Sequence, residues 1–237
     1  MAIRFAFLVL EEHPYGRDML KALIDEGFVP EVVIQEVSAI GDEERQKFFD
    51  RMAGCEIAPR INELVTGKKI PIYNVPNHNG NGCYELLQQF QPELIVLGGT
   101  RIIKERVLTI PPKGTLNAHP GMLPWLRGSA SVGWALYKNL PVGATVHYID
   151  PGIDTGDIIY REQIKVVRGD TYESLNGKVS KLSAELMVRA VRDISNDLVN
   201  RIPQDPNEGE TFRVIPEDLL AIGKQALADG SYGHFNE

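Results

Sequence analysis

The feature that most constrains the fold is a series of short apolar runs separated by segments with helical periodicity. The run at residues 3–10 is nearly continuous, which is typical of a strand buried on both faces of a parallel sheet. Apolar side chains then repeat at helical spacing over residues 19–24, Gly27 provides a stop, and residues 32–34 form another apolar run. This pattern predicts a strand-helix-strand unit of the usual right-handed kind.

The alternation of apolar runs and helical periods continues along the chain. Further strands are predicted at residues 70–75, 94–97, 115–119, 144–149 and 158–166, and helices at residues 42–52, 59–65, 84–90 and 172–194. The polar run at residues 77–82 is expected to be an exposed turn that leaves His78 in solvent. We therefore expect an α/β fold, a Rossmann-like and mostly parallel sheet flanked by helices, with a main domain over residues 1–200. The tail, residues 201–237, is expected to be a small C-terminal extension with a strand at 211–215 and a helix at 218–228.

Composition excludes several classes of function. The chain has 237 residues and a formal net charge of −7, without any stripe of Lys and Arg, which weighs against nucleic acid as a partner. No apolar run approaches the roughly 20 residues that span a bilayer, and the N-terminus lacks a signal pattern, so we expect a cytoplasmic protein without membrane contact. Cys55 and Cys83 lie far apart without ligand spacing, so neither a disulfide nor a metal site is indicated.

Polar side chains gather where two predicted strands end. Asn117 and His119 are two positions apart, so strand alternation places them on one face at the carboxyl end, where open α/β sheets bind ligands. The strand at residues 144–149 runs into a Gly-rich loop from which Asp150, Asp154 or Asp157 can bring a carboxylate to that place. Taken singly these are ordinary strand-end and turn residues. Their joint order, with a Leu-Pro loop between them, favours a site.

At these residues the sequence resembles the folate-dependent formyltransferases, the family of glycinamide ribonucleotide, methionyl-tRNA and sugar N-formyltransferases. The family pattern is an Asn-x-His pair, a Leu-Pro-x-x-x-Gly-like loop with Arg before the Gly, and an Asp in a Gly-flanked loop. The resemblance implies that residues 1–200 form a formyltransferase catalytic domain with Asn117, His119 and Asp154 as catalytic residues. It also implies 10-formyltetrahydrofolate as the cosubstrate, used without a metal.

The predicted folate site follows the strand at residues 94–97. Gly98 and Gly99 allow a flat ligand to approach the backbone closely. The resemblance implies that main-chain groups after them meet the pteridine ring. The predicted cofactor-binding residues are Gly99, Thr100, Arg101, Ile102, Ile103, Asp150 and Ile153. The alternative is a plain strand-to-helix turn with Ile102 and Ile103 in the core.

The predicted substrate-binding residues lie in the loop between the catalytic positions. They are Leu123, Pro124, Arg127 and Gly128. Ser129 or Ser131 is expected to cap the following helix, whose start favours negative charge. Arg127 either neutralises a substrate carboxylate or phosphate, or pins the loop by binding carbonyl oxygens.

The implied chemistry assigns a role to each catalytic residue. Formyl transfer to an amine builds negative charge on the formyl oxygen, and Asn117 and His119 can donate hydrogen bonds to it, each worth about 3 kcal/mol of transition-state stabilisation. Asp154 would set the charge and tautomer of His119 and help take the proton that the amine sheds. His147 is a further candidate for the same cleft.

The acceptor is inferred by comparison within the resembling family. Glycinamide ribonucleotide formyltransferases carry a Gly-Ser-Asn-type phosphate loop after the first strand, whereas this chain has Glu11 and Glu12, whose carboxylates would repel a phosphate. Methionyl-tRNA formyltransferases add a basic C-terminal domain, whereas this chain ends acidic. The remaining acceptor is a primary amine on a small molecule, most closely a nucleotide-linked amino sugar, as in the sugar N-formyltransferases. Because those enzymes are often homodimers, the resemblance also implies a homodimer. A formyltetrahydrofolate hydrolase, a glycinamide ribonucleotide formyltransferase and a non-catalytic folate-binding protein stay open as alternatives.

Overall fold

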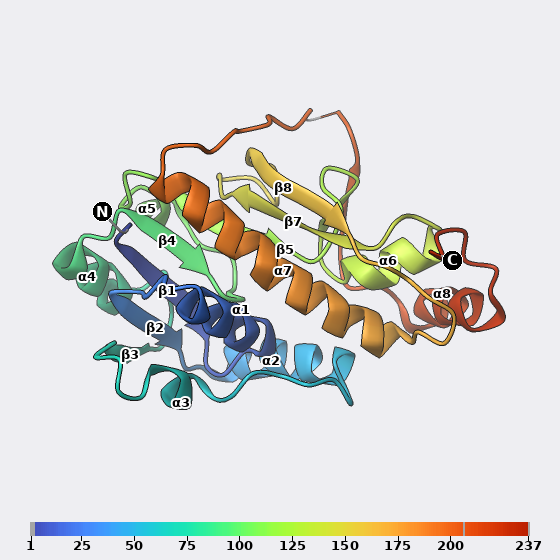
Figure 1. The fold of residues 1–237 in the computed structure, drawn as a ribbon, viewed down its shortest axis with the longest axis horizontal. Helices are drawn as coiled ribbons and strands as arrows, with labels where there is room; N and C mark the ends of the chain where they lie inside the picture. Colours follow the sequence, from blue (N-terminus) through green and yellow to red (C-terminus); the bar gives the residue numbers. More distant parts are fainter. Residues whose placement is uncertain (1–2, 206, 237) are drawn as a thin grey trace.

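The computed structural model describes residues 3–205 and 207–236 and confirms the α/β fold (Figure 1). Seven strands form one sheet in the order β3-β2-β1-β4-β5-β7-β8. The strands of this sheet are β1 (Phe5–Leu10), β2 (Val32–Glu36), β3 (Ile72–Val75), β4 (Leu94–Leu97), β5 (Thr115–His119), β7 (Gly143–Tyr148) and β8 (Ile158–Gln163). The helices are α1 (Pro14–Asp25), α2 (Ala39–Arg51), α3 (Ile61–Val65), α4 (Asn81–Phe90), α5 (Glu105–Leu108), α6 (Ser131–Tyr137), α7 (Tyr172–Ser195) and α8 (Glu217–Asp229).

Among the described strands of the sheet, β7 runs in the direction opposite to the rest. The pairings from β3 through β5 are parallel, whereas β7 pairs antiparallel with both β5 and β8. The chain order reverses between β1 and β4, which is the switch point where sheets of this kind leave a crevice for a ligand. The carboxyl ends of β1, β4 and β5 therefore meet at one edge, beside the antiparallel β7.

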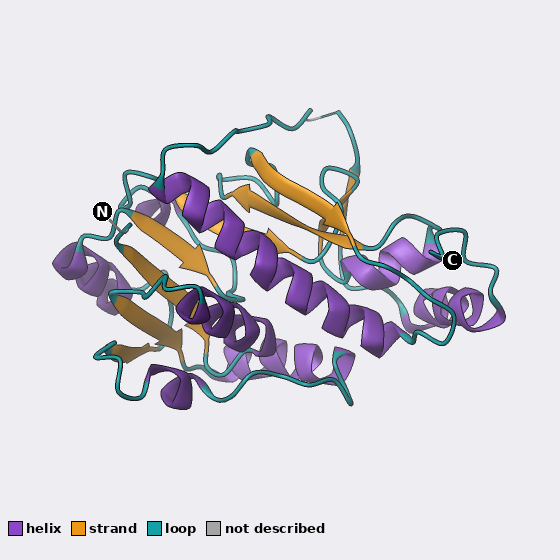
Figure 2. Cartoon of the chain, in the orientation of Figure 1, coloured by secondary structure: helices purple, strands orange, loops and turns teal. Residues whose placement is uncertain are grey.

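Helices cover both faces of the sheet, which explains why the first strand is apolar throughout. Phe7 and Val9 belong to a core cluster with residues of α1 and α7, while Ala6 and Leu8 belong to a second cluster with residues of α4 and α5. Figure 2 shows α1 and α7 lying across the near face of the sheet. Because successive side chains of a strand point to opposite faces, each face of β1 contributes to a different half of the core.

The C-terminal segment is built onto the main body. A short strand β9 (Glu210–Phe212) pairs in parallel with β6 (Leu126–Gly128), and α8 packs against α6. Leu227 and Tyr232 join the core cluster of α1 and α7, and the Tyr232 hydroxyl donates to the Leu140 carbonyl at 2.7 Å. The segment is thus anchored by its own apolar residues as well as by backbone pairing.

Two local expectations were wrong, and two short elements were not predicted. His78 is fully buried rather than solvated, with Nε2 3.0 Å from the Ile34 carbonyl and Nδ1 3.4 Å from Oε2 of the Glu36 carboxylate. Neither Ser129 nor Ser131 caps α6, because its N-cap is Ala130 in the left-handed region and no side chain caps it. The elements α5 and β6 were not predicted, since four and three residues are too few to show a period.

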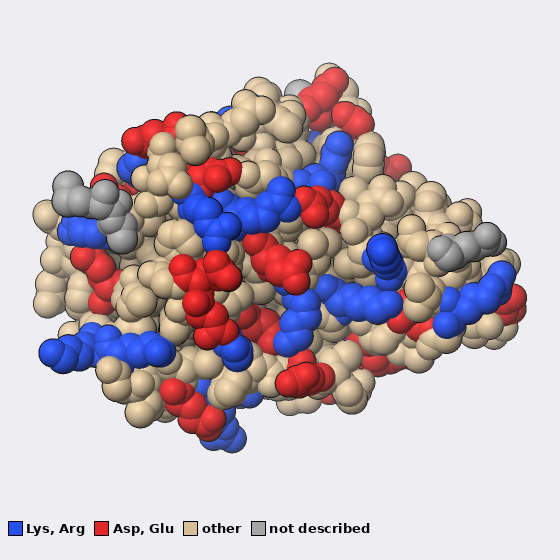
Figure 3. Space-filling model, viewed as in Figure 1, with Lys and Arg blue, Asp and Glu red and all other residues tan. Residues whose placement is uncertain are grey.

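Charges of both signs are mixed over the face shown in Figure 3. On α7, for example, Lys181 pairs with Asp18, Arg189 with Glu162 and Arg192 with Glu26. Within the part of the chain that the structure describes, no helix combines the length and apolarity that crossing a membrane requires.

Candidate active site

The candidate site begins with two polar residues that face each other across neighbouring strands. Asn117 on β5 is in register with His147 on β7, and Nδ2 of Asn117 lies 3.3 Å from Nε2 of His147. His119 ends β5 two positions later, and its ring lies 6.4 Å from the His147 ring, centroid to centroid. The two-residue period of a strand and the antiparallel pairing thus bring one amide and two imidazoles together, and His147 does lie beside Asn117 and His119.

Asp154 reaches both histidines from the loop after β7. Its Oδ2 lies 3.3 Å from Nδ1 of His119, and its Oδ1 lies 3.6 Å from Nε2 of His147. Oδ2 also accepts a hydrogen bond of 2.8 Å from the Gly128 amide. The backbone of Asp154 has φ of +54°, a conformation that costs a residue with a side chain about 1–3 kcal/mol. The surrounding contacts therefore hold Asp154 in a backbone conformation that it would not favour by itself.

The electrostatics of the site favour a neutral His147 beside an ionised Asp154. The pKa of His147 is lowered to about 4, mainly by burial and also by the neighbouring His119, although Asp154 acts in the opposite direction. Burial alone would raise the pKa of Asp154, but His119, His147 and the Gly128 amide outweigh it, so the net shift of this pKa is downward. At neutral pH the candidate site thus holds a negative charge next to the uncharged imidazole of His147.

His119 is held by more than the carboxylate. Its Nε2 donates to the Leu126 carbonyl at 2.6 Å and lies 3.1 Å from Oγ of Ser131, and the residue is only 2% exposed. A Cβ at Gly121 would come 2.8 Å from the same nitrogen and 2.7 Å from the Ser131 Cβ, so a side chain at this position cannot coexist with the ring. Sequence reasoning missed both contacts of Nε2, because nothing local marks Ser131 or the Leu126 carbonyl as a partner of His119.

The residues predicted to bind the folate lie on two loops that flank Asn117. Ile102, after β4, is 76% exposed and Ile153, after β7, is 51% exposed, which is unusual for large apolar side chains. Ile103 is buried in the core cluster of α4 and α5. Of the alternative that placed both isoleucines in the core, the structure bears out Ile103 only.

The other predicted folate-loop residues hold the loops themselves. Nη1 of Arg101 donates to Oε1 of Glu36 at 2.9 Å, and the Asp150 carboxylate accepts from the Gly152 amide at 3.0 Å and from the Thr155 hydroxyl at 2.6 Å. Gly99 has φ of +87°, and a Cβ there would come 2.5 Å from Nδ1 of His13, so glycine is needed. Thr100 is half-buried beside it.

The residues predicted to bind substrate contact mainly the chain itself. Leu123 and Pro124 are buried, and Gly128 is half-buried. Arg127 is buried, and its guanidinium donates to the Gln204 side chain and to the carbonyls of Asp205 and Glu208. The geometry therefore supports the pinning role of Arg127, directed at the C-terminal segment.

The loop after β1 is less acidic than its sequence indicates. Glu11 pairs with Arg45 at 3.3 Å, while Glu12 pairs with Arg17 at 3.8 Å and accepts from the Ile61 amide at 3.2 Å. Each carboxylate is thus offset by a nearby guanidinium. This loop therefore repels a phosphate less strongly than two unpaired carboxylates would.

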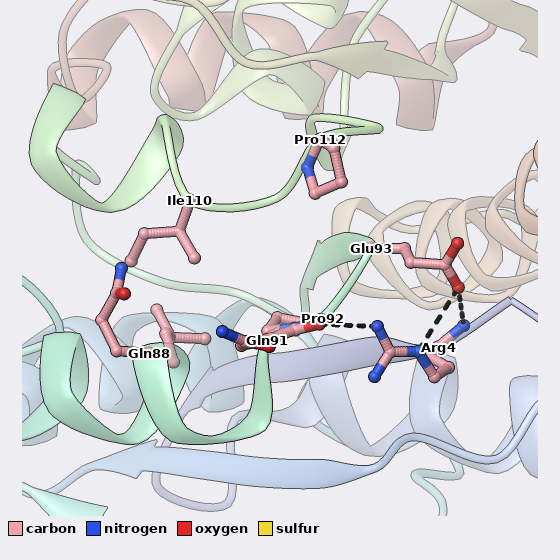
Figure 4. Close-up of a pocket in the computed structure, with 8 residues that line it drawn as sticks. Arg4, Gln88, Gln91, Pro92, Glu93, Ile110 and Pro112 are labelled. Atoms are coloured by element: carbon pink, nitrogen blue, oxygen red, sulfur yellow. Dashed lines mark hydrogen bonds and ion pairs between the residues drawn. The ribbon is translucent and has the colours of Figure 1, made fainter.

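A hollow in the surface lies away from the candidate site. It measures about 300 Å³ and lies at the amino ends of β1 and β4, lined by Arg4, Gln91, Glu93 and Pro112 among others, where Arg4 is tied to Glu93 and the Gln91 carbonyl (Figure 4). It lies at the edge of the sheet opposite the candidate site. Within residues 3–205 and 207–236 no group of three or more His, Cys, Asp or Glu side chains is arranged to hold a metal ion.

Comparison with known proteins identifies relatives of the chain. The formyl transferase family model matches residues 3–191. Methionyl-tRNA formyltransferase from Syntrophus aciditrophicus is 34% identical over 151 residues, which are 63% of this chain and 48% of that protein. The chain thus spans about half the length of the curated relatives that it matches.

Solved structures share the fold. Glycinamide ribonucleotide transformylase 1 from Symbiobacterium toebii superposes with a TM-score of 0.65 at 22% identity, covering 84% of this chain and 94% of that one. A 4-N formyltransferase from Francisella tularensis gives a TM-score of 0.65 at 20% identity, covering 96% of this chain and 88% of that one.

Proposed function

The chain belongs to the formyl transferase family, and from that premise we propose that it transfers a formyl group from 10-formyltetrahydrofolate to a primary amine. The observation that carries the proposal is the gathering of Asn117, His119 and Asp154 around His147 beside the carboxyl end of β5. Asp154 lies within ion-pair distance of His119 and His147, and Asn117 lies within hydrogen-bond distance of His147. An amide donor, an imidazole and an ionised carboxylate are the groups that acyl transfer to an amine requires.

The exposed surface beside Asn117 fits the proposed donor. Ile102 and Ile153 present apolar area from two loops that flank β5, as a flat, partly apolar ring would require. Among the described residues, no backbone hydrogen bond engages the main chain of Arg101, which is half-buried, so this group could bind a polar edge of the ring. When bound, 10-formyltetrahydrofolate supplies the formyl carbon.

The residues of the cleft divide the chemistry among them. Nδ2 of Asn117 donates a hydrogen bond to the oxygen that gains negative charge during transfer, and it is the more accessible donor because Asn117 is half-buried. His119 adds a second donor once Nε2 exchanges the Leu126 carbonyl for that oxygen. Asp154 holds the His119 ring in orientation and, being ionised, accepts the proton that the attacking amine sheds.

We propose a small molecule, a nucleotide-linked amino sugar, as the acceptor. The net charge of −7 and the mixing of acidic and basic side chains in Figure 3 support an acceptor without a long phosphate backbone. Methionyl-tRNA is the second candidate, because the matched curated relatives carry that activity in their names.

A spectrophotometric assay of the purified protein with 10-formyltetrahydrofolate tests both levels of the proposal. The arms are a panel of nucleotide-linked amino sugars, glycinamide ribonucleotide, methionyl-tRNA and a no-acceptor control. Turnover with an amino sugar alone is the expected result. Turnover without an acceptor would indicate a hydrolase. Turnover only with methionyl-tRNA would show that the acceptor is methionyl-tRNA and not an amino sugar. No turnover in any arm would contradict the proposed reaction.

A further inference from the structure

One side chain of the C-terminal segment contacts the backbone of the candidate catalytic loop. Nε2 of Gln204 donates to the carbonyl of Asp154 at 2.9 Å and to the carbonyl of Gly156 at 2.7 Å. Its Oε1 accepts from Arg127, at 3.2 Å from Nε and 3.1 Å from Nη2. Gln204 thus joins the loop after β7 to the strand β6, and it lies outside residues 3–191, the part that matches the family model.

These contacts close a ring around Asp154. Arg127 donates to Gln204, Gln204 donates to the Asp154 carbonyl, and the Asp154 carboxylate accepts from the amide of Gly128, the neighbour of Arg127. The backbone end of Asp154 is therefore fixed by Gln204 and its carboxylate end by Gly128. Both contacts thus depend on β6, one through Arg127, which binds Gln204, and the other through Gly128.

Asp154 needs such a clamp because its backbone is strained. With φ of +54° the residue sits in the left-handed region, which an aspartate leaves readily unless its surroundings hold it. A return to the ordinary region would rotate the carboxylate away from His119 and His147. A shift of about 1 Å in a catalytic group can cost on the order of 100-fold in rate.

We propose that Gln204 is a positioning residue for the proposed formyl transfer, acting through the backbone of Asp154, so that the C-terminal segment completes the active site. The proposal rests on the proposed function. Only glutamine or asparagine offers an acceptor for Arg127 and donors for two carbonyls on one side-chain group, and glutamine has the longer reach. Glutamate at this position would keep the Arg127 contact but place a carboxylate oxygen against two carbonyl oxygens.

Gln204→Glu therefore separates positioning from simple attachment of the tail. Attachment alone predicts that Gln204→Glu behaves like the wild type, since Arg127 keeps its acceptor. Positioning predicts a kcat lower by about 10- to 100-fold with the KM of donor and acceptor little changed. The matched control is Glu208→Ala, which removes the 2.8 Å bond from Trp125 to the tail without touching Asp154.

A second readout does not depend on turnover. The Gly128 amide donates to the Asp154 carboxylate, so its hydrogen exchange, followed by NMR, reports whether that carboxylate is in place. We expect exchange at Gly128 to be at least about tenfold faster in Gln204→Glu and unchanged in Glu208→Ala. Equal behaviour of the two variants, in kcat or in exchange, would overturn the positioning role. If the wild type shows no turnover in any acceptor arm, the proposed function fails, and the exchange measurement still decides whether Gln204 positions Asp154.

Discussion

Asp154 faces His119 across the end of the sheet, with Oδ2 of the carboxylate 3.3 Å from Nδ1 of the ring. The two residues come from separate elements, β5 and the loop after β7, and each has other contacts that fix its orientation. The carboxylate fixes the orientation of the buried imidazole, so that the ring can act as a directed hydrogen-bond donor.

Replacing His119 with Ala should lower kcat by about 100- to 1000-fold, because the charge that develops on the transferred group loses a donor. Steady-state kinetics with the acceptor found in the panel measures this loss. Far-UV circular dichroism and a thermal melt on the same variant should show a folded protein. A kcat near that of the wild type would contradict the catalytic assignment of His119.

Replacing Gly121 with Ala should impair catalysis without any change to a reacting group. The new Cβ would meet Nε2 of His119 at 2.8 Å and the Ser131 side chain at 2.7 Å, so the ring must move. We expect kcat to fall about 10- to 100-fold. Gly82→Ala is the control, since a Cβ there meets only Cγ1 of Val75 at an ordinary 3.8 Å. Equal kcat values for the two variants would count against the orientation of His119 described above.

Replacing Ile102 with Ser should weaken binding of the folate donor and leave kcat nearly unchanged. Ile102 is exposed, so its loss removes contact area for the ligand but little packing within the protein. A buried isoleucine is worth about 2 kcal/mol, so the KM for the donor should rise by about 10- to 30-fold. Ile222→Ser on α8 changes a similarly exposed isoleucine and should leave that KM unaltered. A donor KM within twofold of the wild type in Ile102→Ser would place the donor elsewhere.

The free energy of unfolding should decrease as the pH falls from about 6.5 toward 4. Burial is the main cause that lowers the pKa of His13 to about 3, of His147 to about 4, and of His78 below its ordinary value. The unfolded chain takes up protons at these histidines near pH 6.5 while the folded chain does not, so the stabilisation is complete above that pH and is lost below it. Each of His13 and His147 should contribute a loss of about 2 kcal/mol between pH 7.5 and pH 5, measured by urea unfolding.

His13→Phe isolates one contribution to this pH dependence. Nδ1 of His13 is buried and has no hydrogen-bond partner among the described residues, and its ring packs at a tilt against Phe48 with a centroid distance of 4.3 Å, so a phenyl ring suits the position. The variant should lose less stability between pH 7.5 and pH 5 than the wild type and should parallel it between pH 7.5 and pH 9. An unchanged slope below pH 7.5 would show that His13 titrates normally in the folded chain.

Replacing Asp18 with Ala should destabilise the fold without a direct effect on the site. The Asp18 carboxylate is buried between α1 and α7, and it accepts from the Ala58 amide at 2.9 Å, the Ser180 hydroxyl at 2.7 Å and Nζ of Lys181 at 2.8 Å. The loss of this acceptor leaves two buried donors without a partner and should cost about 2–3 kcal/mol in urea unfolding. Asp18→Asn, which retains an acceptor oxygen, should lose less. Equal stability of the Ala variant and the wild type would mean that water replaces the carboxylate at no cost.

The sequence by itself determined the sheet and the pair at its edge. A run such as residues 3–10 predicts a two-sided buried strand, and the two-residue period alone places Asn117 and His119 on one face. These are local properties, because the preference of a segment for strand or helix depends mainly on its own side chains and their spacing. For the same reason α5 and β6, with only a few residues each, left no readable period.

Only the tertiary structure decided what surrounds that pair. Arg127 reaches Gln204 across 77 positions, Gln204 reaches Asp154 across 50, and β6 finds its partner in β9. His78 is buried against Glu36 although its neighbours in the chain are polar turn residues. Such pairings depend on which surfaces meet after the sheet has formed. The residues around a glutamine in a polar tail look the same whether that glutamine positions a catalytic loop or lies in solvent. The sequence therefore determined the frame and the candidate catalytic residues, while long-range packing determined what holds Asp154 in place.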